Sequence, residues 1–198
     1  MSLKNIATGE LAAELRTRND LFDAEGFMLY ELYLLVAAIQ PIPCVDGVAV
    51  RRRNGVVEAL AIVRGTGKER GKWCSVGGKI RKNESKADAL RRHFLTDLKC
   101  GIEMLVPWDQ PVIGLQCANQ QDVGNNPDFG PEYGKHTVSD YYPVRLLDEP
   151  EFGKTVVGGQ EAIGYAWFSK ETLPPREAFG FDQGPKFIAC LEVAEKLV

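Results

Sequence analysis

The stretch that decides the fold runs from Trp73 to Gly101 and reads WCSVGGKIRKNESKADALRRHFLTDLKCG. Its double glycine, Gly77-Gly78, lets the backbone run close to whatever lies above it. Glu84 follows Gly78 after five residues, and Arg92 follows Glu84 after seven. A carboxylate and a guanidinium at these positions can form an ion pair that fixes the loop on the helix that follows it.

We expect that helix to run from about Ser85 to Leu98, because Ser85 and Asp88 approximate a capping box. Apolar residues recur along it at helical spacing and should form one stripe that packs on a sheet. The stripe consists of Ala87, Leu90, Phe94 and Leu98. On the other side, three polar residues should converge on one patch with Arg92 at its edge. These are His93, Thr96 and Asp97.

The spacing of Gly78, Glu84 and Arg92 resembles the opening of the Nudix hydrolase signature. This resemblance implies an α/β fold, the Nudix-type α/β/α sandwich with a mixed β-sheet. In that family three helix glutamates hold the magnesium ions that polarise a diphosphate. Here those positions hold His93, Thr96 and Asp97, and only Asp97 is an oxygen ligand of the right charge.

A branch that lacks two of the three glutamates is the GDP-mannose mannosyl hydrolase group, which this sequence resembles beyond the helix. That group has an arginine nine residues before the aromatic residue that leads into the double glycine, and Arg64 has this spacing from Trp73. The resemblance implies that Arg64, Lys79 and Arg92 contact a nucleoside diphosphate derivative. Cleavage would occur at carbon, with Arg64 and Arg92 contributing to catalysis.

The same resemblance implies an Mg²⁺ ion held by Asp97 and by a backbone carbonyl of Gly77 or Gly78. In the GDP-mannose mannosyl hydrolase group the catalytic histidine lies where a polar loop leads into a strand. His136 has that setting here, after a loop rich in Gly, Pro and Asn. His136 is therefore the candidate general base, and the adjacent Lys135 is a candidate substrate contact. A histidine near a strand is also often only a structural hydrogen-bond donor.

Two further residues of the motif are candidates only. His93 could transfer a proton or bind a ligand, or it could simply be a helix-surface residue bonded to water. Glu84 could serve the site through its pairing with Arg92. Basic residues around the glycine-rich loop favour phosphate binding over a merely solvated charge run. They are Arg64, Lys68, Arg70, Lys72, Lys79 and Arg81.

The sequence pattern divides the chain into two parts. We expect an N-terminal helical extension (1–40) followed by a Nudix hydrolase-like domain (41–198). Within the domain, two strands over 44–52 and 56–64 flank an Asn54-Gly55 pair that suits a tight hairpin. Further strands are expected around 73–76 and within 104–117, 136–146 and 163–168. The C-terminal helix should carry an apolar stripe of Phe187, Ile188, Leu191, Ala194 and Leu197.

Composition narrows the function classes. With 198 residues and a formal net charge of -3, the chain is not expected to hold long nucleic acid through phosphate-backbone electrostatics. Its five cysteines are widely spaced without a CxxC pair, so we expect reduced, mostly buried thiols. No stretch has the length of a membrane span or the pattern of a secretory signal, and we expect a cytoplasmic protein with no membrane partner. The N-terminal helices are candidates for a homodimer interface.

Three functions fit the residues. The first is an Mg²⁺-dependent hydrolase of a nucleotide sugar, with C–O cleavage by a histidine base. The second is a Nudix pyrophosphohydrolase that cleaves P–O bonds, for which Glu103 or Asp128 would have to supply the missing metal ligands. The third is a non-catalytic module that binds a nucleotide or sugar nucleotide.

Overall fold

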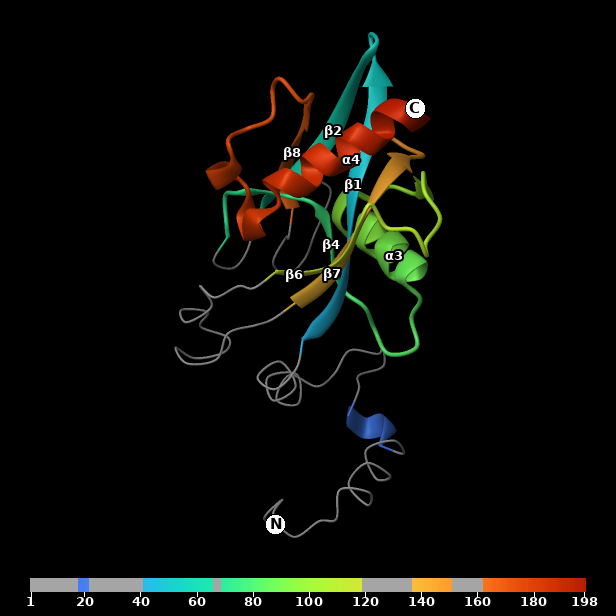
Figure 1. The fold of residues 1–198 in the computed structure, drawn as a ribbon. Coiled ribbons are helices and arrows are strands. Elements are labelled where there is room, and N and C mark those ends of the chain that lie inside the picture. The colour runs from blue at the N-terminus through green and yellow to red at the C-terminus, as the bar shows by residue number, and fades with distance from the viewer. Residues whose placement is uncertain (1–17, 22–40, 66–68, 119–136, 151–161) are drawn as a thin grey trace.

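The computed structural model describes residues 18–21, 41–65, 69–118, 137–150 and 162–198 (Figure 1). The predicted N-terminal helices lie almost wholly outside these residues, so the extension over 1–40 and its role in a homodimer stay predictions. The strands and helices of the described residues follow in chain order. The strands are β1 (Ile42–Arg53), β2 (Val56–Arg64), β3 (Trp73–Cys74), β4 (Val76–Lys79), β5 (Ile102–Met104), β6 (Ile113–Ala118), β7 (Thr137–Leu146) and β8 (Ala162–Phe168). The helices are α3 (Lys86–Leu98) and α4 (Gly184–Leu197), with short 3₁₀ turns η2 (Asn19–Leu21), η4 (Arg176–Ala178) and η5 (Gly180–Asp182).

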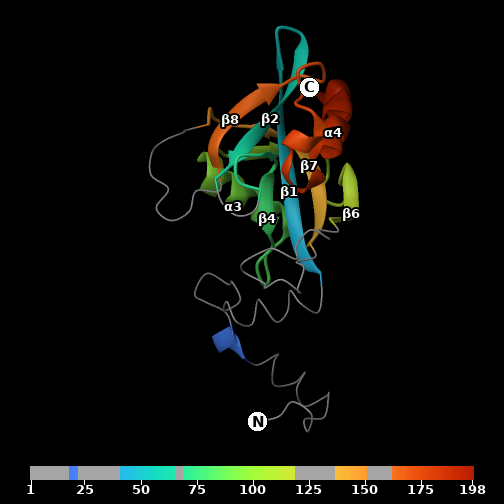
Figure 2. The same cartoon turned by 90° about the vertical axis from the view of Figure 1, so that its left-hand side faces the viewer.

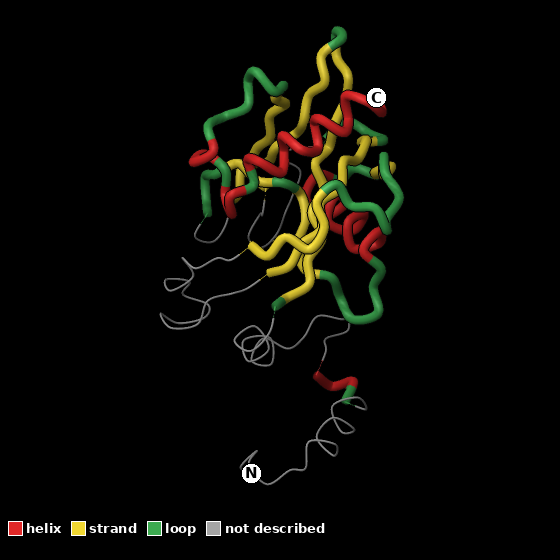
Figure 3. The backbone as a smooth tube through the Cα atoms, viewed as in Figure 1, coloured by secondary structure: helices red, strands yellow, loops and turns green. Residues whose placement is uncertain are grey.

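The strands of the described residues form one mixed sheet, which makes the middle layer of the molecule (Figure 3). Strand β1 lies at its centre and is parallel to β7 but antiparallel to β2 and β4. The two antiparallel partners share β1 between them, since β4 pairs with its first half and β2 with its second. The remaining strands extend the sheet on both sides, with β3 and β8 on β2, and β5 and β6 on β7.

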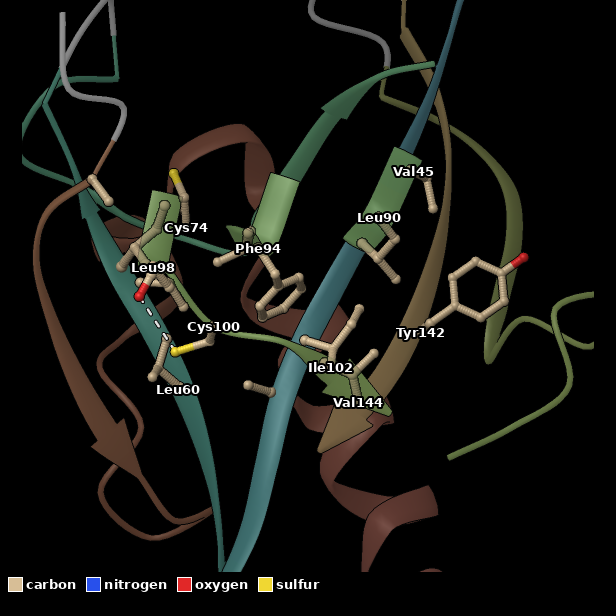
Figure 4. Close-up of a cluster of buried hydrophobic side chains, with 14 of the residues drawn as sticks. Val45, Leu60, Cys74, Leu90, Phe94, Leu98, Cys100, Ile102, Tyr142 and Val144 are labelled. Carbon is tan, nitrogen blue, oxygen red and sulfur yellow. Dashed lines mark hydrogen bonds between the residues drawn. The ribbon is translucent and has the colours of Figure 1, made fainter. Parts of the chain in front are cut away.

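The two helices cover opposite faces of this sheet, as the side view shows (Figure 2). Leu90, Phe94 and Leu98 of α3 pack with Val45 and other strand residues on one face (Figure 4). The other face is covered by α4, whose buried residues pack on a second set of strand side chains. The predicted α/β/α sandwich is therefore confirmed.

The hairpin between β1 and β2 has the predicted two-residue turn. Arg53 pairs with Val56, so only Asn54 and Gly55 lie in the turn. Both have positive φ, 51° and 82°, which is the geometry that an Asn-Gly pair adopts at little cost. The turn sets the register of β1 against β2 and so fixes which of their side chains face α3.

Two predicted apolar stripes need correction. On α3 the buried alanine is Ala89, whereas Ala87 is only half-buried. On α4 the buried residues include Phe187, Cys190, Leu191 and Ala194, but Ile188 and Leu197 are 44% and 47% exposed. In both helices the spacing of apolar residues predicted the helical period but not which of them are buried, since that depends on how the helix packs on the sheet.

The strand expected within 104–117 is two strands, β5 and β6, with Leu105 to Val112 between them. The prediction of buried thiols holds for Cys44, Cys74, Cys100 and Cys190. Within the described ranges, neither helix has the length and the apolar character needed to cross a bilayer. The predicted cytoplasmic location stays a prediction.

Candidate functional site

The double glycine is part of strand β4. Gly77 pairs with Asp46 of β1, and Gly78 pairs with Val45. A Cβ atom on Gly77 would lie 2.3 Å from the Val45 carbonyl oxygen, and one on Gly78 would lie 2.8 Å from Cε1 of His93. Glycine at both positions therefore lets β4 fit between β1 and helix α3.

Glu84 and Arg92 form the predicted ion pair, which ties the loop after β4 to α3. Arg92 donates from Nε to one carboxylate oxygen of Glu84 at 2.7 Å and from Nη2 to the other at 2.8 Å. The same Nη2 donates to the Lys79 carbonyl at 2.9 Å, and the backbone N–H of Arg81 donates to Glu84 at 2.9 Å. These hydrogen bonds, above all those from Arg92, hold the pKa of the Glu84 carboxyl below its usual range.

The guanidinium of Arg92 thus bonds within the protein, to Glu84 and to the backbone carbonyl of Lys79. Its side chain in this ion pair is only 17% exposed. This geometry fits a role in holding the loop better than the direct substrate contact that the resemblance implied.

His93 lies over Gly78 and contacts the same backbone carbonyl. Its Nε2 is 3.1 Å from the Lys79 carbonyl oxygen, and a bond to that acceptor needs the proton on Nε2. Further along α3, Thr96 is exposed and Asp97 is half-buried, with its Oδ2 atom inaccessible to solvent. His93 is thus a partner of the β4 backbone and is not simply a solvated helix-surface residue.

Arg64 is the last residue of strand β2. Its backbone N–H donates to the Lys72 carbonyl at 2.9 Å, and its guanidinium lies 5.1 Å from the centre of the Phe181 ring. The Cys74 thiol is buried, and burial raises its pKa to about 12, while the positive charge of Arg64 acts in the opposite direction and lowers that pKa.

The candidate residues come from different strands. Arg64 ends β2, which pairs with β3, whereas Gly77, Gly78 and Lys79 belong to β4, which pairs with β1. Of the predicted basic cluster, Arg70 is exposed, Lys72 pairs with Glu69 at 2.7 Å, and Lys68 lies outside the described residues.

His136 and Lys135, the candidate base and substrate contact, also lie outside the described residues. The structure does describe the strand that follows them. Thr137 begins β7 opposite Ile42, and Ser139 pairs with Cys44, which in turn pairs with Lys79. Strand β7 therefore begins at the end of the sheet where β4 and the double glycine lie.

A buried acid that the sequence analysis missed ties this end of the sheet together. Asp46 is 9% exposed, accepts a hydrogen bond from Ser75 Oγ at 2.8 Å and accepts another from Ser139 Oγ. Gln183, at the start of α4, accepts from the Ser75 backbone at 2.8 Å and donates to the Tyr141 hydroxyl at 3.2 Å. A buried carboxylate needs such partners, and an aspartate inside an apolar strand was the signal available in the sequence.

A second buried acid anchors the start of α3. Asp140 on β7 is 4% exposed and forms an ion pair with Lys86, the first residue of the helix. Two ion pairs therefore fix α3: Glu84–Arg92 joins it to the preceding loop, and Lys86–Asp140 joins it to strand β7.

The donors for a metal ion are few. Among the described residues, no three His, Cys, Asp or Glu side chains are grouped to hold an ion. Glu103, a candidate substitute ligand, pairs on the surface with Arg145 at 2.9 Å, and Asp128 lies outside the described residues. The half-buried Asp97 carboxylate fits an Mg²⁺ ion that keeps its waters and takes other ligands from substrate phosphates.

Comparisons with known proteins identify the class of fold: the chain has the fold of the Nudix hydrolases. No protein-family model matches the sequence, and no curated protein matches it. A protein from Jonesia denitrificans, described as a possible asymmetric diadenosine tetraphosphate hydrolase, is 24% identical with a TM-score of 0.60, over 81% of this chain and 98% of that one.

Two other solved structures are similar. The Nudix domain of Shewanella oneidensis NrtR, solved with ADP-ribose, is 15% identical with a TM-score of 0.56, over 96% of this chain and 99% of that one. The C. elegans Ap4A hydrolase is 11% identical with a TM-score of 0.53, over 78% of this chain and 98% of that one.

Proposed function

We propose that this protein hydrolyses a small nucleoside diphosphate derivative with the help of Mg²⁺. The observation that carries the proposal is the frame of β4 and α3. Gly77 and Gly78 let the strand approach the helix, and the bidentate Glu84–Arg92 pair fixes the connection between them. A frame fixed in this way would pre-organise a phosphate site.

The proposed roles follow from the positions of the side chains. Arg64, from the end of β2, and Lys79, from the end of β4, bind the diphosphate, and Lys135 adds a further contact. Arg92 acts through the backbone at Lys79, which it holds by a 2.9 Å hydrogen bond. Asp97 and a carbonyl of Gly77 or Gly78 would hold the Mg²⁺ ion, which neutralises charge on the departing diphosphate.

Within this class we propose a nucleotide sugar as the substrate and cleavage at carbon. The support is the replacement of two helix glutamates by His93 and Thr96, which leaves a single carboxylate, Asp97, at the box positions. With so few metal ligands, a protein base is the better source of the nucleophile. His136 would take a proton from water as that water attacks the anomeric carbon.

Product analysis tests the proposal. Nucleotide sugars and dinucleotides would be incubated with and without Mg²⁺ in ¹⁸O-labelled water. Cleavage at carbon yields a nucleoside diphosphate and a free sugar that carries the label. Asp97→Ala and His136→Ala should each remove most of the turnover. Unchanged turnover in either variant would contradict this mechanism.

Two alternatives have specific support. Attack at phosphorus is supported by the similar structures that are described as diadenosine tetraphosphate hydrolases. For a nucleotide sugar it predicts a nucleoside monophosphate and a sugar phosphate, one of which carries the label. A non-catalytic module is supported by the altered box and by the ADP-ribose bound to the NrtR domain, and it predicts binding without turnover.

We also propose a homodimer formed through the N-terminal helices. Light scattering on the full chain measures its mass directly. A mass of one chain would contradict the dimer and leave the hydrolase proposal unaffected.

A further inference from the structure

Two consecutive residues near the C-terminus have a left-handed backbone although neither is glycine. Phe181 has φ 54° and ψ 27°, and Asp182 has φ 53°. A bulky residue rarely adopts this conformation, because its Cβ crowds the backbone. Such strain persists only where surrounding contacts enforce it, and it gathers at functional sites.

Contacts from three sides enforce the conformation of η5. Arg176 forms two hydrogen bonds with the Asp182 carboxylate, at 2.5 and 2.6 Å. The buried Lys186 donates from Nζ to the Asp182 carbonyl at 2.7 Å. Gly180 lies so close to β3 that a Cβ atom would be 2.8 Å from the Cys74 sulfur.

The enforced turn presents one side chain to the candidate site. The Phe181 ring packs against the core cluster beneath α3, and the Arg64 guanidinium lies 5.1 Å from the ring centre. A guanidinium at this distance is attracted by the face of the ring. The backbone of Arg64 is held as well, since its carbonyl accepts a hydrogen bond from Gly71 N–H at 2.8 Å.

We infer that Phe181 is a positioning residue, held in a strained turn so that its ring fixes the Arg64 guanidinium for a substrate diphosphate. The inference rests on the proposed function, in which Arg64 binds that diphosphate. An arginine side chain loses much conformational freedom when it binds an anion, so a ring that orders it beforehand strengthens binding.

The matched control lies in the same sheet. Arg51 stacks on Trp167 with 4.0 Å from its guanidinium carbon to the ring centre, and Trp167 also packs against the cluster beneath α3. Trp167→Leu and Phe181→Leu therefore each remove an aromatic ring beneath an arginine. Only Phe181→Leu removes it at Arg64.

Two measurements test the inference on the full chain. The first is the NMR signal of the Arg64 Nε–Hε group, assigned by its loss in Arg64→Lys. We expect a ring-current shift that Phe181→Leu abolishes, whereas Phe181→Tyr and Trp167→Leu keep it. The second is the Kd for ADP and for GDP with Mg²⁺, measured by titration calorimetry.

We expect Phe181→Leu to weaken the binding of the better nucleotide about five-fold, the factor that a cation–π contact of ordinary strength gives. Phe181→Tyr should restore the affinity, and Trp167→Leu should leave it unchanged. If Phe181→Leu loses the ring-current shift but binds as tightly as the wild type, the positioning role is wrong and the proposed function stands. If the wild-type protein binds neither nucleotide, the proposed function fails and the inference fails with it.

Discussion

Glu84 shows how a single charge organises the candidate site. It accepts hydrogen bonds from Arg92 and from the Arg81 backbone while its side chain in the ion pair is 13% exposed. Ion pairs on the surface contribute little to stability, whereas breaking a buried pair leaves an uncompensated charge. The stability of the β4–α3 connection should therefore depend on Glu84 far more than on exposed acids.

We predict that Glu84→Gln lowers the free energy of unfolding by about 2 kcal/mol, since it removes charge-assisted bonds from a half-buried guanidinium. Urea denaturation followed by circular dichroism measures the loss. The control is Glu103→Gln, because Glu103 pairs with Arg145 on the surface and is 53% exposed. A loss of similar size in both variants would contradict a special role for Glu84.

The same pair predicts a pH dependence. The pKa of Glu84 is lower in the folded protein than its ordinary value of 4.5, so the folded state binds the proton more weakly than the unfolded state does. The stabilisation is complete above the unfolded pKa and is lost as the pH falls through the folded pKa. The difference in unfolding free energy between wild type and Glu84→Gln should thus shrink below about pH 4.5. A difference that stays constant from pH 7 to pH 3 would rule out this linkage.

Among the glycines that the structure describes, Gly77 is the one where an added Cβ would make the shortest contact. An added Cβ would lie 2.3 Å from a backbone oxygen of β1, and backbone cannot move aside as a flexible side chain can. We predict that Gly77→Ala costs about 3 kcal/mol, the upper part of the range for overpacking. Gly164→Ala is the control, because a Cβ there would meet Val63 at an ordinary 3.6 Å. Thermal melts of the two variants should differ clearly, and equal melting temperatures would contradict the proposed packing.

At the scale of elements, the start of helix α3 is defined by its N-cap residue, Ser85. Ser85 has an extended backbone, and its Oγ accepts a hydrogen bond from the Asp88 N–H at 3.1 Å. We predict that Ser85→Ala lowers the unfolding free energy by about 1 kcal/mol, as the loss of an N-cap does. Thr96→Ala, on the exposed side of the same helix, should change it little. A Ser85→Ala variant as stable as the wild type would show that the cap is not needed.

The sequence predicted elements whose signals are local and missed those that depend on distant partners. The Asn54-Gly55 turn and the Ser85 cap were found because a few neighbouring residues define each. The strand expected around 73–76 covers β3 and only the first residue of β4. The rest of β4 was missed because glycine has low strand propensity, and Gly77 and Gly78 lie in a strand that pairs with a distant one, β1.

The same holds for the site. The Glu84–Arg92 pair was predictable, since both residues belong to one motif. The buried role of Asp46 was not, because its partners Ser75 and Ser139 lie on other strands. No periodicity in the sequence records which strands become neighbours.

At the scale of the whole molecule, the candidate site joins distant parts of the chain. Arg64 ends β2, while Asp97 lies near the end of α3. A ligand that contacts both would tie β2 to α3, and it would stabilise the folded protein as a whole.

We therefore predict that GDP or ADP raises the melting temperature only when Mg²⁺ is present. At a ligand concentration of about 100 Kd the gain in unfolding free energy should be about 2.7 kcal/mol. EDTA should abolish the shift, and Asp97→Asn should reduce it to the level seen without the metal. An equal shift with and without Mg²⁺ would show that Asp97 does not bind the nucleotide through a metal.

The parallel pairing of β1 with β7 also governs how the chain reaches this structure. Ile42 pairs with Thr137, so the centre of the sheet joins segments separated by most of the domain. Contacts this distant in sequence are entropically costly to close and slow folding. On the ribosome, at about 5–20 residues per second, β1 waits roughly 5–20 s for β7 to be synthesised. During that interval the β1–β2 hairpin can form but lacks the strand that completes its centre, and its apolar edge is then most exposed to aggregation and to chaperones.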